Sequence, residues 1–146
     1  MTSKHVVLVI ACAGLLFAYQ YALVLGTGYA LALPPPSGWR ASFPTHLSGS
    51  LTWLILVHTF AVLIVSVPFA LLIARFGGPR APVIALAITA ALFALFSLPP
   101  FIEFFGIMSP RTRVVTAFDQ IKLILVLPVL VWLMRKLPSN NRSRGP

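Results

Sequence analysis

Long apolar runs, separated by short clusters of proline, glycine and basic residues, dominate this chain. Four such runs lie at about 6–26, 48–74, 82–107 and 114–134. Each run is long enough to cross a hydrocarbon layer of roughly 30 Å as a helix that rises about 1.5 Å per residue. A helix also satisfies its own backbone hydrogen bonds where water is absent. The pattern therefore predicts an all-α integral membrane protein, with a four-helix transmembrane bundle over residues 1–137.

The residues between the runs mark where the helices are expected to end. A proline-rich link follows the first run at 33–40, and paired glycines with Pro79 follow the second. Pro99 and Pro100 interrupt the third run, so its helix either ends there or continues to Ile107, and Pro110 precedes the fourth run. Proline removes a backbone donor and glycine raises chain entropy, which makes these positions natural boundaries.

Composition supports a membrane protein and argues against a soluble domain. Apolar residues make up 59% of the chain and charged residues 9%, with a mean hydropathy of +0.97. Soluble domains average about 25% charged residues. The net charge of +9 comes from 11 basic residues against only Glu103 and Asp119. The basic residues stand at the ends of the apolar runs and form no basic face with interleaved aromatics, so we expect no nucleic-acid partner.

The basic residues also predict an orientation. Seven flank one side of the bundle and three flank the other: Lys4, Arg75, Arg80, Arg135, Lys136, Arg142 and Arg144 against Arg40, Arg111 and Arg113. Because positive charge is retained on the cytoplasmic side, we expect both termini in the cytoplasm of a multi-pass protein, with the bacterial inner membrane as its location. Residues 138–146 are expected to form a disordered basic tail.

Small residues recur at every fourth position of the first run and form the clearest periodic pattern in the chain. This helix-packing stripe consists of Gly14, Ala18, Ala22, Gly26 and Ala30. Small side chains allow the backbones of two membrane helices to approach closely. The stripe fits packing within the bundle, and it equally fits self-association or an interface with another membrane protein. A related line in the third run passes through Ala87, Ala90, Ala91 and Ala94.

A few polar side chains fall inside the apolar runs at similar depths. Counting residues from the predicted outer boundary places five of them in one layer: Gln20, His58, Glu103, Asp119 and Lys122. Asp119 and Lys122 share a helix face because three residues separate them. Charged side chains in a membrane usually face the bundle interior, a partner or water. We therefore expect an inward-facing polar layer that is either structural or a ligand or proton site.

The sequence gives no pattern for a cofactor or for catalysis. The three histidines, His5, His46 and His58, fall at different depths, whereas a bis-histidine haem needs two at one depth. No zinc-ligand spacing is present, and Cys12 is the only cysteine. No phosphate loop or nucleophile motif occurs. We expect no catalytic residue, no metal and no cofactor.

Three functions remain open on this basis. The first is an accessory or partner-binding subunit that acts by protein–protein interaction in the lipid bilayer, without chemistry of its own. The second is a small oligomeric transporter or channel that uses the polar layer. The third is an intramembrane enzyme acting on lipid or quinone.

Overall fold

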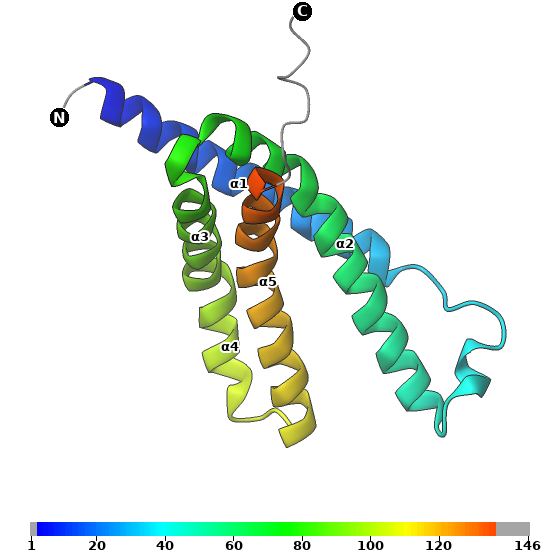
Figure 1. The fold of residues 1–146 in the computed structure, drawn as a ribbon. Helices are drawn as coiled ribbons and strands as arrows, with labels where there is room; N and C mark the ends of the chain where they lie inside the picture. The colour runs from blue at the N-terminus through cyan, green and yellow to red at the C-terminus, as the bar shows by residue number, and fades with distance from the viewer. Residues whose placement is uncertain (1–2, 137–146) are drawn as a thin grey trace, which may run out of the picture. The chain divides into compact units, whose positions relative to one another are not determined.

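The protein is helical throughout the part that the structure describes. The computed structural model covers residues 3–136, and no strand occurs among them. The elements in chain order are α1 (Ser3–Leu31), η1 (Trp39–Ser42), α2 (His46–Phe76), η2 (Gly78–Arg80), α3 (Ala81–Leu92), η3 (Phe93–Ser97), α4 (Leu98–Phe105) and α5 (Pro110–Lys136) (Figure 1). The basic tail predicted for 138–146 lies outside the described residues.

Four helical stretches are long and apolar enough to cross a membrane. They are Val9–Leu31, His46–Phe76, Gly78–Phe105 and Thr112–Lys136 among the described residues. The sequence prediction of four long apolar helices is confirmed in number and order. The first helix is longer than expected at its C-terminal end: it continues through Thr27 and Gly28 as far as Leu31, and the first proline follows only at Pro34.

The third stretch continues through Pro99 and Pro100 and does not stop at them. The turn before them, η3, is a wide π-helical turn in which the Leu98 N–H donates to the Phe93 carbonyl. A proline ring clashes with the carbonyl four residues before it. A π-helical turn widens the backbone at that place, and such turns are a recognised cause of helix bends. The helix therefore accommodates both prolines and ends only after Phe105.

The chain divides into two compact units, the first ending at Ser66 and the second beginning at Val67. In the first unit, α1 packs on the beginning of α2. An ideal Cβ placed on Gly26 would lie 2.5 Å from Val65 Cγ2, so the helix backbone comes very close to this side chain. Among the described side chains of α1, Tyr19, Leu23 and Ala30 are buried.

The link between α1 and α2 is held by aromatic side chains. The Trp53 indole N–H donates to the Leu33 carbonyl at 3.0 Å, and the Trp39 indole N–H donates to the Gly49 carbonyl at 2.9 Å. The Trp39 and Trp53 rings meet edge to face, with centroids 5.4 Å apart. These contacts fasten the proline-rich link to the first turns of α2.

The second unit contains a helical hairpin in which α3, η3 and α4 run alongside α5 (Figure 1). The buried face of α3 consists of Ala81, Ala85, Ile88, Thr89 and Leu92, and α5 buries Leu127 and Val131. At the end of the hairpin where α3 begins, the Arg135 guanidinium donates to the Pro79 carbonyl at 3.1 Å.

The turn before α3 requires glycine at adjacent positions. An ideal Cβ on Gly77 would lie 2.6 Å from the Ile73 carbonyl oxygen, and Gly78 has a φ of +53°. At Gly77 a side chain would contact the backbone, and at Gly78 a side chain would be disfavoured by the left-handed conformation. The paired glycines therefore allow the chain to reverse within a few residues.

Candidate functional site

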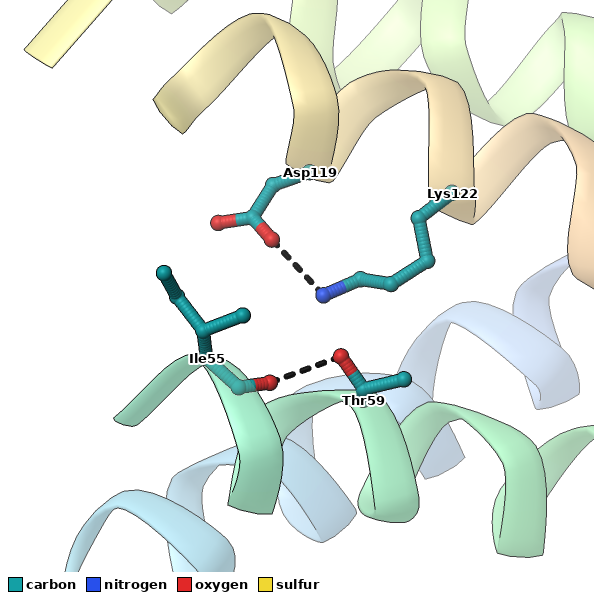
Figure 2. A network of polar contacts seen from close by, with 4 residues as sticks. All are labelled: Ile55, Thr59, Asp119 and Lys122. Atoms are coloured by element: carbon teal, nitrogen blue, oxygen red, sulfur yellow. Dashed lines mark hydrogen bonds and ion pairs between the residues drawn. The ribbon is translucent and has the colours of Figure 1, made fainter. Parts of the chain in front are cut away.

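An ion pair within α5 is the main charged feature of the apolar helices. The Lys122 ammonium reaches back along its own helix and donates to Asp119 Oδ1 at 2.7 Å (Figure 2). The Lys122 side chain is 7% exposed and the Asp119 side chain 29% exposed. The three-residue separation brings the two groups together on one helix face, as expected. Pairing makes two charges tolerable on a helix that is otherwise apolar.

Hydroxyl side chains in the apolar helices donate to the carbonyls of their own helix. Figure 2 also draws the bond from Thr59 Oγ1 to the Ile55 carbonyl in α2, at 2.7 Å. Ser66 Oγ donates to the Val62 carbonyl at 2.6 Å, and in α3 Thr89 Oγ1 donates to the Ala85 carbonyl at 3.1 Å. Each hydroxyl proton is thereby satisfied without a second helix.

Tyr19 and Ser66 form a neutral polar contact between two helices of the first unit. Their side-chain oxygens lie 2.7 Å apart, and both residues are 0% exposed. The single Ser66 proton goes to the Val62 carbonyl. The Tyr19 hydroxyl is therefore the donor and Ser66 Oγ the acceptor. The sequence analysis did not predict a role for Tyr19, because this residue lies one position after Ala18 and thus off the small-residue stripe.

The side-chain oxygen of Gln120 is a second polar group that the sequence analysis did not predict. Its Oε1 is buried and has no hydrogen-bond partner within the described part of the chain. Gln120 directly follows Asp119 on α5. A buried acceptor that lacks a donor is unfavourable, and it can be relieved by water or by a ligand that carries a hydroxyl or N–H group. Such an atom is a candidate point of ligand contact.

The five residues of the predicted polar layer belong to different units. Gln20 and His58 are half-buried on α1 and α2 of the first unit. Asp119 and Lys122 lie together on α5 of the second unit, whereas Glu103 is exposed on α4. Among the described side chains, Glu103 forms no ion pair with Lys122. Asp119 and Lys122 are thus brought together, and a single layer of all five residues stays a prediction.

The small-residue stripe of α1 divides into two halves. Towards the C-terminal end, Gly26 approaches Val65 and Ala30 is buried. Towards the N-terminal end, Gly14 and Ala18 are exposed, and an ideal Cβ on Gly14 would meet nothing within 4 Å. Ala22 lies between the two halves and is half-buried.

The line of small residues expected in the third run is not the face that packs. Ala87, Ala90 and Ala94 are exposed, and Ala91 is half-buried. The buried face passes instead through Ala85 and its neighbours one helical turn away. Alanines occur all around this helix, so their spacing alone did not identify the face that meets α5.

Among the described residues, no group of three or more histidine, cysteine or acidic side chains is placed to hold a metal ion. Cys12 is a free, half-buried thiol on α1. No family model matches the chain, and searches of curated proteins and of solved structures find no significant similarity.

Proposed function

We propose that this chain is a four-span protein of the bacterial inner membrane, with both termini in the cytoplasm. Large apolar side chains are exposed on every long helix, including Phe17, Ile64, Val83 and Phe118. Exposing such surface to water is unfavourable by about 25 cal/mol per Å², whereas acyl chains solvate it without that penalty. The excess of basic residues on one side supports the orientation.

Within that membrane, the proposed role is to bind another membrane protein, or a second copy of this chain, as an accessory subunit. One observation carries the proposal: α2 uses the C-terminal half of the α1 stripe, while Gly14 and Ala18 in the other half are left exposed. An exposed line of small residues allows a partner helix to approach closely, and membrane helices associate largely through such packing.

Cross-linking in native membranes tests this role. A tagged chain is cross-linked, purified in detergent and analysed by mass spectrometry, in parallel with the variants Gly14→Leu and Ala18→Leu. Both variants are expected to reduce partner recovery, because a leucine at either position would keep the backbones of the two helices apart.

Ala13→Leu is the matched control, since Ala13 is exposed on the same helix but points about 100° away from its neighbour Gly14 and so off the stripe. It is expected to recover the partner as the wild type does. Equal recovery from all four proteins, or a wild-type chain that is recovered alone, would contradict the proposed role.

A second candidate function, a small oligomeric transporter or channel, is favoured by α5. This helix carries both the Asp119–Lys122 pair and the unsatisfied Gln120 oxygen. Ionisable groups within a membrane often mark the path of an ion or substrate. If transport is the function, purified protein in liposomes conducts ions or substrate, and Asp119→Asn or Lys122→Met abolishes the flux. Liposomes that stay tight with the wild-type protein would contradict this candidate.

A further inference from the structure

An apolar groove runs between the end of α1 and the middle of α2 in the first unit. It has a volume of about 350 Å³, within the range of about 300–1,000 Å³ typical of ligand sites. Its wall includes Gly26 and Ala30 from α1 and Leu33 from the link, together with Val57, Ala61 and Ile64 from α2. The small residues on both helices leave space between the larger ones. The groove therefore fits a slender apolar chain.

A second hollow is lined by residues that directly follow the groove residue Leu33 in the chain. Leu33 lines the groove, and the next residue, Pro34, lines the hollow, which has a volume of about 450 Å³. Arg40 and His46 also line the hollow, and both side chains are exposed. Residues 1–66 contain no acidic residue, so the first unit has no carboxylate that could neutralise the Arg40 guanidinium. The hollow is thus suited to an anion.

The link that carries Arg40 is fixed in place. Trp39, immediately before Arg40, donates its indole N–H to the Gly49 carbonyl and meets Trp53 edge to face. Trp53 in turn donates to the carbonyl of Leu33, the groove residue that directly precedes the hollow in the chain. Tryptophan side chains favour the level of lipid headgroups. The cationic hollow is therefore expected at the membrane interface and the groove below it.

We propose that the groove holds an acyl chain of one anionic phospholipid, whose headgroup lies against Arg40 and His46. An apolar chain joined to an anionic group is what an apolar groove followed in the chain by a cationic hollow would recognise. The charge complementarity favours a lipid over an uncharged partner helix as the occupant. The inference rests on the membrane insertion proposed above, and it does not depend on the identity of a partner protein.

Photolabelling tests the site with two probes that differ only in headgroup. The full-length protein is reconstituted into phosphatidylcholine vesicles that contain a small amount of either phosphatidylglycerol or phosphatidylcholine with the same photoreactive acyl chain. The labelled residues are mapped by mass spectrometry. The anionic probe is expected to label the groove segments 26–33 and 57–65 in preference to other apolar faces, and to do so more than the zwitterionic probe.

Variants separate the headgroup contact from the acyl-chain contact. Arg40→Gln is expected to lower the preference for the anionic probe about fivefold, which corresponds to about 1 kcal/mol for one basic residue near an anionic group. Ala61→Phe fills the groove and is expected to abolish labelling there, whereas Ala11→Phe, exposed on α1 outside the groove, retains it. Because Arg40 lies in the link, its variant reports on the site even if Ala61→Phe disturbs helix packing.

Several results would overturn the proposal. Equal labelling by the two probes would refute the anionic headgroup, and even labelling around all four long helices would indicate boundary lipid only. A protein cross-link from the groove to a second copy or a partner helix would replace the lipid as occupant. Flotation of the protein with the vesicles is measured separately. If the protein floats and captures a partner but shows no headgroup preference, only the lipid proposal is refuted. If the protein does not float, membrane insertion is refuted as well.

Discussion

The two units handle polar groups among apolar helices in different ways. In the first unit, the neutral hydroxyls of Tyr19 and Ser66 meet between two helices, with both residues fully buried. In the second unit, the charged groups of Asp119 and Lys122 meet within one helix, and the aspartate is partly exposed. One contact joins two elements of the fold, while the other neutralises charge on a single element.

This difference separates two effects that are easily confused. A hydrogen bond between helices stabilises a tertiary arrangement, yet such bonds average only about 0.6 kcal/mol in membrane proteins. An ion pair within one helix adds little to tertiary structure, yet removing one member leaves the other charge in an apolar surrounding. The charged pair should therefore be more sensitive to a single substitution than the neutral contact.

The largest expected effect is that of Lys122→Met. This change removes the ammonium group that donates a hydrogen bond to Asp119 Oδ1. The free energy of unfolding is therefore expected to fall by about 3 kcal/mol. Unfolding by sodium dodecyl sulfate in mixed micelles, followed by circular dichroism, measures the change.

The double variant Asp119→Leu with Lys122→Met is the control for that effect. It removes both charges and is expected to recover to within about 1 kcal/mol of the wild type, since apolar replacement of a buried pair is often neutral. If the double variant is as unstable as Lys122→Met, the pair does more than neutralise charge, and the contrast between the two units is lost.

An intermediate effect is expected from Gly26→Leu in the first unit. The added side chain would overlap Val65 and force α1 and α2 apart, which is expected to lower the free energy of unfolding by about 2 kcal/mol. Gly28→Leu is the control two residues away, because an ideal Cβ on Gly28 meets nothing within 4 Å. Similar losses in the same micelle assay for both variants would mean that the close approach at Gly26 is unimportant.

The smallest expected effect is that of Tyr19→Phe. Ser66 Oγ keeps its bond to the Val62 carbonyl, so only the bond between the helices is lost. A double-mutant cycle of Tyr19→Phe with Ser66→Ala is expected to give a coupling energy of about 0.6 kcal/mol. A coupling energy of zero would show that the hydroxyl contact adds nothing to the packing, whereas one as large as the ion-pair effect would reverse the comparison.

Most of the fold could be predicted because each helix has its own signal in the sequence. The apolar runs gave the four long helices, and the glycines at 77 and 78 marked the turn before α3. The sequence did not predict whether the third helix would end at Pro99 and Pro100 or continue through them. Two prolines indicate either an end or a bend, and the π-helical turn that decided between them involves Phe93 and Leu98, which carry no such signal.

The candidate site was predictable only where it depends on a single helix. The three-residue spacing of Asp119 and Lys122 fixes their contact without any knowledge of packing. The contact between Tyr19 and Ser66, and the unsatisfied oxygen of Gln120, depend on how helices meet. Neither helix contains that information alone, and a repeat of small residues does not tell which neighbour it faces.

The most direct test of the account is the accessibility of three single cysteines in a Cys12→Ser background. Ser37, Pro79 and Ser109 are exposed and lie in the three connections between the long helices, and each is replaced by cysteine in turn. In spheroplasts, a membrane-impermeant maleimide is expected to label the variants Ser37→Cys and Ser109→Cys, and to label Pro79→Cys only after permeabilisation. Labelling of all three without permeabilisation, or recovery of the protein from the soluble fraction, would contradict a four-span protein with both termini in the cytoplasm.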